Sequence, residues 1–133
     1  MPMTYLLDTS TWLWLVESPG KLSSKVADIT SKIEHAPFGL SVMSVWEVAK
    51  KVSLGKLTVS LAIRDWMAKA LREPFVEVVP LSVEIVLDGN QLPGVFHNDP
   101  ADQLIVATAR TLNLTLLTKD DSILKYPHVL AIW

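Results

Sequence analysis

The sequence contains no cysteine, and this absence removes several kinds of chemistry at once. Disulfide bonds, thiolate metal sites and a cysteine nucleophile are all excluded. The absence also agrees with a cytoplasmic protein, because stabilising disulfides are found chiefly in chains that leave the reducing cytosol. We therefore expect a cytoplasmic location and a functional site that uses side chains other than thiols.

A large excess of either charge is also missing. Lys and Arg number 12, Asp and Glu number 14, and the net charge is −2, with a pI of about 5.9. Proteins that bind nucleic acid through a broad basic surface have a different composition. Any polyanion that binds here therefore needs local cations, either side chains or metal ions.

Long apolar runs are absent as well. The first apolar segment, residues 5–16, is too short to span a bilayer, contains Asp8 and has no basic leader before it. It is better explained as a folded strand followed by a helix, and we expect no membrane segment.

The chain has 133 residues, half of them hydrophobic, which predicts one domain over residues 1–133. Short apolar segments predict strands at residues 4–9, 37–41, 74–81, 114–118 and 128–133. Helical spacing of apolar residues predicts helices at residues 10–18, 21–35, 41–57, 60–73, 82–89, 99–113 and 120–126. Because helices alternate with fully apolar strands, we expect an α/β three-layer sandwich with a central, mainly parallel sheet.

Acidic residues recur where the predicted strands end or the predicted helices begin. Ligands of open parallel sheets bind beyond the carboxyl ends of the strands, so these acids are candidates for one shared site. They come from four separate segments: Asp8, Glu47, the pair Asp99 and Asp102, and the pair Asp120 and Asp121.

Each acid also has an ordinary structural explanation. Asp8 suits the start of the first helix, Asp99 before Pro100 suits a helix cap, and Asp120 or Asp121 suits a cap of the last helix. Glu47 suits an ion pair with Lys51 one turn on, although its apolar neighbours make that less typical. The joint occurrence of the acids at one end of one sheet favours the shared site.

Clustered carboxylates repel one another, and some would take up protons unless a cation lay between them. A site of oxygen ligands without cysteine or paired histidines favours Mg²⁺ or Mn²⁺ over Zn²⁺. The histidines His35, His97 and His128 are scattered, and no two have a helical ligand spacing. Such a metal site polarises phosphodiesters and activates water, so we expect a metal-dependent phosphodiesterase.

Four motifs in order, "YLLDTS", "SVMSVWEVAKKVSLGKL", "HNDPADQLIVATAR" and "LTLLTKD", resemble the PIN domain. More narrowly, they are similar to the VapC-type toxins of type II toxin–antitoxin systems. The resemblance covers nearly the whole chain. It implies a PIN-like fold and a Mg²⁺- or Mn²⁺-dependent endoribonuclease that hydrolyses RNA to products with 5′-phosphate ends. It also implies a homodimer and a cognate antitoxin whose tail occupies the active-site groove.

The resemblance also implies which acids act. Carried over by motif, the catalytic and metal-binding residues are Asp8, Glu47, Asp102 and Asp120. Asp99 is expected as a helix cap or an outer-shell ligand. Thr9, Ser10 and Thr118 could bond to carboxylates or metal waters, although ordinary capping or strand-end bonding is the favoured explanation for them.

The sequence is also compatible with two other functions. One is a catalytically silent PIN-like module that binds nucleic acid or protein. The other is a phosphatase with Asp8 as nucleophile, but "DTST" lacks the second acid two residues on, and only Lys119 loosely matches the expected late lysine.

Nearby lysines, among them Lys51 and Lys119, could steer RNA or be ordinary solvated residues. Trp12 and Trp14 cannot both face the same point of the core.

Overall fold

Five parallel strands form the sheet of this protein, in the order β3-β2-β1-β4-β5. The computed structural model describes residues 2–72 and 75–133. The strands are β1 (Tyr5–Leu7), β2 (Phe38–Ser41), β3 (Val76–Val79), β4 (Thr115–Leu117) and β5 (Ala131–Ile132). The expected parallel sheet is confirmed, with every strand pair parallel.

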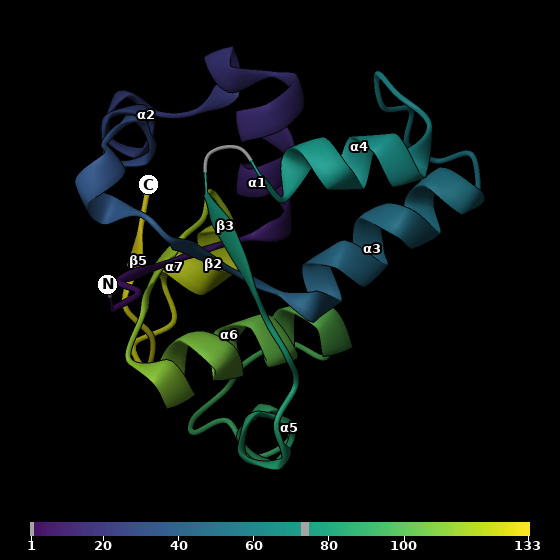
Figure 1. The fold of residues 1–133 in the computed structure, drawn as a ribbon. Coiled ribbons are helices and arrows are strands. Elements are labelled where there is room, and N and C mark those ends of the chain that lie inside the picture. Colours follow the sequence, from purple (N-terminus) through teal and green to yellow (C-terminus); the bar gives the residue numbers. More distant parts are fainter. Residues whose placement is uncertain (1, 73–74) are drawn as a thin grey trace.

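Helices cover both faces of this sheet (Figure 1). On one side lie α1 (Thr9–Glu17), α2 (Ser24–Ser31), α3 (Val42–Ser53) and α4 (Ile63–Ala70). On the other lie α5 (Val83–Gly89), α6 (Pro100–Leu112) and α7 (Asp121–Leu124). The expected three-layer sandwich is therefore confirmed. Within the described residues, no helix has both the length and the apolar character needed to cross a membrane.

Alternation along β1 explains how two cores arise from one strand. Leu7 packs with Trp12, Phe38 and Trp66 in the core on the α1 side. Leu6 points the other way and packs with Ile105 and other residues under α6. Both leucines are fully buried, so β1 is apolar throughout, as strands covered on both faces are.

The predicted helix over residues 21–35 is wrong in its continuity. Only Ser24–Ser31 are α-helical, flanked by 3₁₀ turns at Pro19–Lys21 and Ile33–His35. Thr30 and Ser31 bond their hydroxyls back to carbonyls of the preceding turn, and such bonds weaken a helix. Pro37 then disfavours helical backbone in the residue before it.

The other predicted helices agree with the structure to within a few residues at their ends. α3 ends at Ser53, before the predicted end at residue 57, and Gly55 follows with φ of +70°, a conformation that favours glycine just past the end of a helix. The predicted end of a helix at residue 73 and the predicted start of a strand at residue 74 lie outside the described residues.

The strand order determines where a site can form. β1 lies between β2 and β4 in the sheet. The helices that follow β1 and β4 lie on opposite faces of the sheet, which leaves a crevice at the carboxyl ends of these two strands. Ligands of open α/β sheets bind at this kind of switch point. Asp8 follows β1, Glu47 lies on the helix after β2, and Asp120 lies just beyond β4. The topology therefore brings three separated acids to one edge of the sheet.

The tryptophans divide between core and surface. Trp12 and Trp66 are fully buried and meet edge to face with ring centroids 5.1 Å apart. Trp14, two residues after Trp12, is partly exposed, as the helical spacing requires. Trp46 is 56% exposed and lies at the surface.

The core that holds α6 against the sheet gives a first prediction. Replacing the fully buried Ile105 by Ala should lower the free energy of unfolding by about 2–5 kcal/mol, because a cavity replaces side-chain contacts. Leu112→Ala is the matched control in the same helix, since Leu112 is 44% exposed, and it should cost well under half as much. Urea unfolding measures both values. Equal costs would contradict the packing described for α6.

Candidate active site

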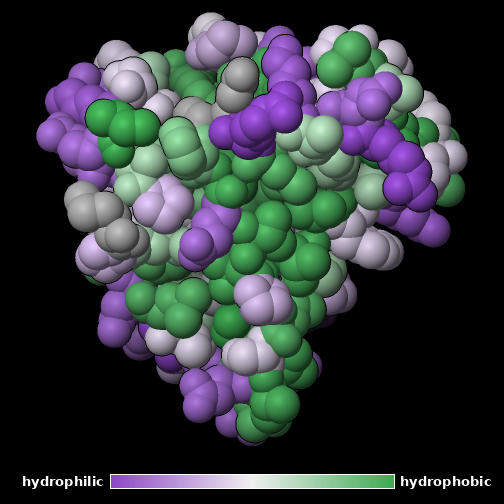
Figure 2. All heavy atoms as spheres, in the orientation of Figure 1, coloured by the Kyte–Doolittle hydropathy of each residue, from purple (hydrophilic) through white to green (hydrophobic). Residues whose placement is uncertain are grey.

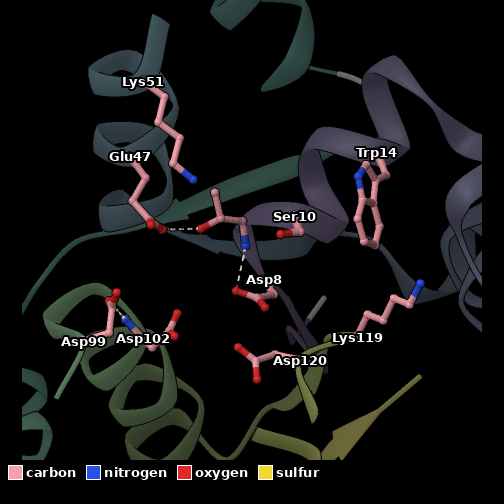
Figure 3. A pocket seen from close by; sticks show the side chains of 10 residues that line it. Asp8, Ser10, Trp14, Glu47, Lys51, Asp99, Asp102, Lys119 and Asp120 are labelled. Atoms are coloured by element: carbon pink, nitrogen blue, oxygen red, sulfur yellow. Dashed lines mark hydrogen bonds between the residues drawn. The ribbon is translucent and has the colours of Figure 1, made fainter. Parts of the chain in front are cut away.

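A cleft of about 460 Å³ opens at the carboxyl ends of β1 and β4. Figure 3 shows its side chains converging from α1, α3, α6 and the loop after β4. All four carboxylates expected from the motifs lie in it. The full lining is Asp8, Thr9, Ser10, Trp14, Glu47, Lys51, Asp99, Asp102, Lys119 and Asp120.

Asp8 is the most deeply buried acid of the cleft, with 7% of its surface exposed. Its Oδ1 accepts a hydrogen bond from the Thr9 backbone N–H at 2.8 Å, and its Oδ2 accepts one from the Thr118 hydroxyl at 2.6 Å. Burial raises the pKa of Asp8. The two hydrogen bonds oppose that rise, while the negative charges of Asp120 and Glu47 add to it.

Thr118 links two of the acids. Its hydroxyl donates to Asp8 and accepts the Asp120 backbone N–H at 3.0 Å. The side chain is fully buried, so these bonds are shielded from water. Thr118 therefore fixes the Asp8 carboxylate relative to the loop that carries Asp120, so its hydroxyl bonds to a site carboxylate in addition to making an ordinary strand-end bond.

Glu47 projects from the second turn of α3 into the same cleft. Its Oε1 accepts a hydrogen bond from the Thr9 hydroxyl at 2.6 Å, and that hydroxyl also lies 2.8 Å from Ser44 Oγ. Thr9 therefore bonds to a site carboxylate, while the cap of α1 is Asp8. Among the described residues, no ion pair joins Glu47 to Lys51, so that explanation of Glu47 does not hold either. Ser44, a buried residue of α3, is part of this network although no sequence motif marks it.

Asp99 and Asp102 have different surroundings at the start of α6. Asp99 is the N-cap, and its Oδ1 accepts the Asp102 backbone N–H at 3.1 Å. The Asp102 side chain points toward Asp8 (Figure 3), and its Oδ2 lies 3.2 Å from His97 Nε2. Burial, followed by the charges of the other acids, raises the pKa of Asp102 to about 7.

Asp120 both caps a helix and faces the cleft. Its Oδ1 accepts bonds from the Ser122 backbone N–H at 2.9 Å and the Ser122 hydroxyl at 2.6 Å. Both bonds use the same oxygen, so the cap does not exhaust the carboxylate. Asp121 does not line the cleft; it is exposed and pairs with Lys125 at 2.7 Å.

The residues present fit a divalent cation. One donor atom each from His97, Asp102 and Asp120 lie within 4.8 Å of one another, and Asp8 and Glu47 line the same cleft. The raised pKa values of Asp8 and Asp102 show that their negative charge is poorly compensated. A hard cation bound among carboxylate oxygens would offset that charge.

His97 is a site residue that the sequence patterns missed. No two histidines have a helical ligand spacing, and that spacing is the usual sequence signal of a histidine metal ligand. His97 lies in the loop before α6, five positions ahead of Asp102, where no regular period connects the two side chains. The sequence feature that points to His97 as a site residue is its position in "HNDPAD", just before the two acids at the start of α6.

The raised pKa values predict how stability depends on pH without metal. Unfolded Asp102 releases its proton near its ordinary value of 3.8, whereas the folded protein holds it until about pH 7. The folded state therefore binds more protons between these values, and its stability falls as pH rises through that window.

Thermal unfolding in a chelator should accordingly show a lower Tm at about pH 8 than at about pH 5. Asp102→Asn should flatten this slope, because no proton is bound or released at that position. Asp121→Asn, outside the cleft, is the control and should keep it. An unchanged slope in Asp102→Asn would contradict the electrostatics described for this cleft.

Known proteins share this fold. The model of the PIN domain family matches residues 5–129. Ribonuclease VapC22 of Mycobacterium tuberculosis is 27% identical over 133 residues, covering 98% of both chains.

Two solved complexes are similar in fold. VapBC2 of Rickettsia felis, bound to promoter DNA, has a TM-score of 0.73 at 15% identity, covering 98% of each chain. FitAcB of Neisseria gonorrhoeae has a TM-score of 0.67 at 20% identity, covering 98% of this chain and 97% of that one. This chain belongs to the PIN domain family.

Proposed function

We propose that the protein is an endoribonuclease that depends on Mg²⁺ or Mn²⁺ and acts as the toxin of a toxin–antitoxin pair. The observation that carries the proposal is the convergence of Asp8, Glu47, Asp102 and Asp120 on one cleft of a PIN domain. The relative named ribonuclease VapC22 supports RNA as the substrate.

The four acids are the proposed catalytic and metal-binding residues. When bound among them, Mg²⁺ or Mn²⁺ would offset their charge, polarise the phosphodiester and make a water molecule a better nucleophile. Thr118 and Thr9 hold Asp8 and Glu47 in place before any ligand arrives, which reduces the cost of ordering the site. Asp99 keeps its role as the cap of α6.

Two lysines at the cleft extend the site toward a polyanion. Lys51 and Lys119 both line it, on opposite sides of the acids in Figure 3. Lys119 Nζ also lies 5.8 Å from the ring centroid of Trp14. Cations in these positions suit the phosphates on either side of the bond that is cut.

The proposed reaction is hydrolysis by water. The water oxygen bonds to phosphorus, and the 3′ oxygen of the preceding nucleotide leaves and takes a proton. The products carry a 5′-phosphate and a 3′-hydroxyl, and the ribose 2′-hydroxyl takes no part. A nuclease that used the 2′-hydroxyl would instead leave a 2′,3′-cyclic phosphate.

Replacing Asp8 by Asn tests this function. Cleavage of RNA with Mn²⁺ present should fall by about 100-fold or more, because a catalytic metal supplies several kcal/mol to the transition state. Without metal the variant should be at least as stable as the wild type, since it removes a buried charge with a raised pKa. Asp121→Asn, an exposed neighbour of the site, is the matched control and should remain active.

Cleavage rates, mapped RNA ends and thermal unfolding are measured on the same preparations. Wild-type activity in Asp8→Asn, or products with 2′,3′-cyclic phosphate ends, would refute the mechanism. A wild-type protein that binds RNA and never cuts it, with any metal, would favour the silent binding module.

We further propose a cognate antitoxin as the protein partner. The solved relatives of this fold include a toxin–antitoxin complex from Klebsiella pneumoniae, which supports such a partner. A segment that enters the acidic cleft would bring basic side chains, because five carboxylates and two lysines line it.

A second copy of the chain is the other proposed partner. Figure 2 shows apolar side chains gathered over β3, the start of α3 and α5. Because β3 is at the edge of the sheet, this apolar face stands at the side of the molecule. The exposed large apolar residues of these three elements are Trp46, Val78, Val83, Val86 and Leu87. Patches of this character mark association surfaces.

Light scattering after size-exclusion chromatography tests this dimer. The wild type should have twice the chain mass of 14.8 kDa, and Leu87→Glu should have the mass of one chain, because a charge would be buried at the interface. Leu130→Glu is the control: Leu130 is 68% exposed and lies at the opposite edge of the sheet, beside β5. A monomeric wild type would contradict the proposal.

A further inference from the structure

The ring of His97 is held in place on several sides. It stacks on Phe96 with ring centroids 4.3 Å apart and an interplanar angle of 28°. The Asp99 backbone N–H donates to its Nδ1 at 3.3 Å, and the His97 carbonyl accepts from Gln103 Nε2 at 2.9 Å. Its remaining nitrogen, Nε2, lies 3.2 Å from Asp102 Oδ2. The ring is therefore oriented before any ligand binds.

The bond from Asp99 decides which nitrogen of His97 carries the proton. A neutral imidazole has one N–H and one lone pair. Since Nδ1 accepts the Asp99 N–H, the lone pair is on Nδ1 and the proton is on Nε2. The 3.2 Å contact is then a hydrogen bond from His97 to the Asp102 carboxylate.

We propose that His97 is a positioning residue of the metal centre, which donates from Nε2 to Asp102 Oδ2 and leaves Asp102 Oδ1 for the cation. The proposal rests on the proposed function of the cleft. Carboxylates that bind metals are commonly oriented by such hydrogen bonds. His97 therefore acts through Asp102 and does not touch the cation itself.

Direct ligation is the competing arrangement, because a His97 nitrogen lies within 4.8 Å of donor atoms of Asp102 and Asp120. Binding metal through Nε2 would move the ring proton to Nδ1. That proton would then face the Asp99 N–H, and two donors would oppose each other. The local backbone thus favours the positioning role.

Two substitutions separate these possibilities with Mn²⁺ as the probe. His97→Gln keeps an N–H donor near the position of Nε2, so it can still reach Asp102. His97→Asn keeps a polar group near Nδ1 but is too short to reach Asp102. Both variants lose the aromatic ring, so they share any loss of stacking on Phe96 and form a matched pair.

Calorimetry of Mn²⁺ binding should show His97→Asn weakened by about 10-fold to 100-fold, and His97→Gln within about 3-fold of the wild type. Thermal unfolding in a chelator should give similar Tm values for the two variants. Pulsed electron paramagnetic resonance of the wild-type Mn²⁺ complex should show no coupling from a directly bonded ¹⁴N nucleus.

Several results would overturn the proposal. These are wild-type affinity in His97→Asn, equal weakening in both variants, or a bonded ¹⁴N signal that His97→Gln removes. Asp8→Asn separates this inference from the function on which it rests. Asp8-dependent Mn²⁺ binding with no effect of His97→Asn refutes the inference alone. Asp8-dependent binding with the expected pattern at residue 97 but no RNA cleavage refutes the function alone. Absence of Mn²⁺ binding by the wild type refutes both.

Discussion

Repulsion among carboxylates is the constraint on which the rest of this site depends. Asp8, Glu47, Asp102 and Asp120 are gathered in one cleft, and the pKa values of Asp8 and Asp102 are raised by burial first and then by the charges of the other acids. A sheet edge that concentrates so much negative charge is unfavourable on its own. The apolar cores on both sides of β1 supply the stability that keeps the acids together.

Much of the fold could be predicted, because its cause lies in local patterns. β1 and β4 are short and apolar, since both of their faces are covered, and α6 begins with a cap and a proline. The break after Ser31 was missed because helical spacing continues through Ile33 while side-chain hydroxyls and a later proline end the helix. The spacing of apolar residues indicates which face of a helix is buried, but it does not show whether side-chain hydroxyls bond to the backbone and end the helix.

The acids of the site could be proposed from their positions at strand ends, but the groups that hold them could not. Thr118 and Asp8 are 110 positions apart, and their hydrogen bond follows from the pairing of β1 with β4. Ser44 approaches Thr9 because α3 packs against α1. Contacts of this kind depend on tertiary structure, so a hydroxyl that organises a site looks the same in the sequence as one that caps a turn.

The helix caps have a consequence for which acid occupies each position. Asp8, Asp99 and Asp120 each accept a backbone N–H at the start of a helix, a bond that requires a short side chain. The carboxylates of Asp8 and Asp120 therefore have to accept a bond at the start of a helix and also reach the cleft. The longer side chain of Glu would move the carboxylate away from the position that allows both. Glu47 lies inside α3, free of any cap, and its longer side chain spans the distance to Thr9. The difference between aspartate and glutamate in this cleft thus follows from helix geometry as much as from the chemistry of a bound ion.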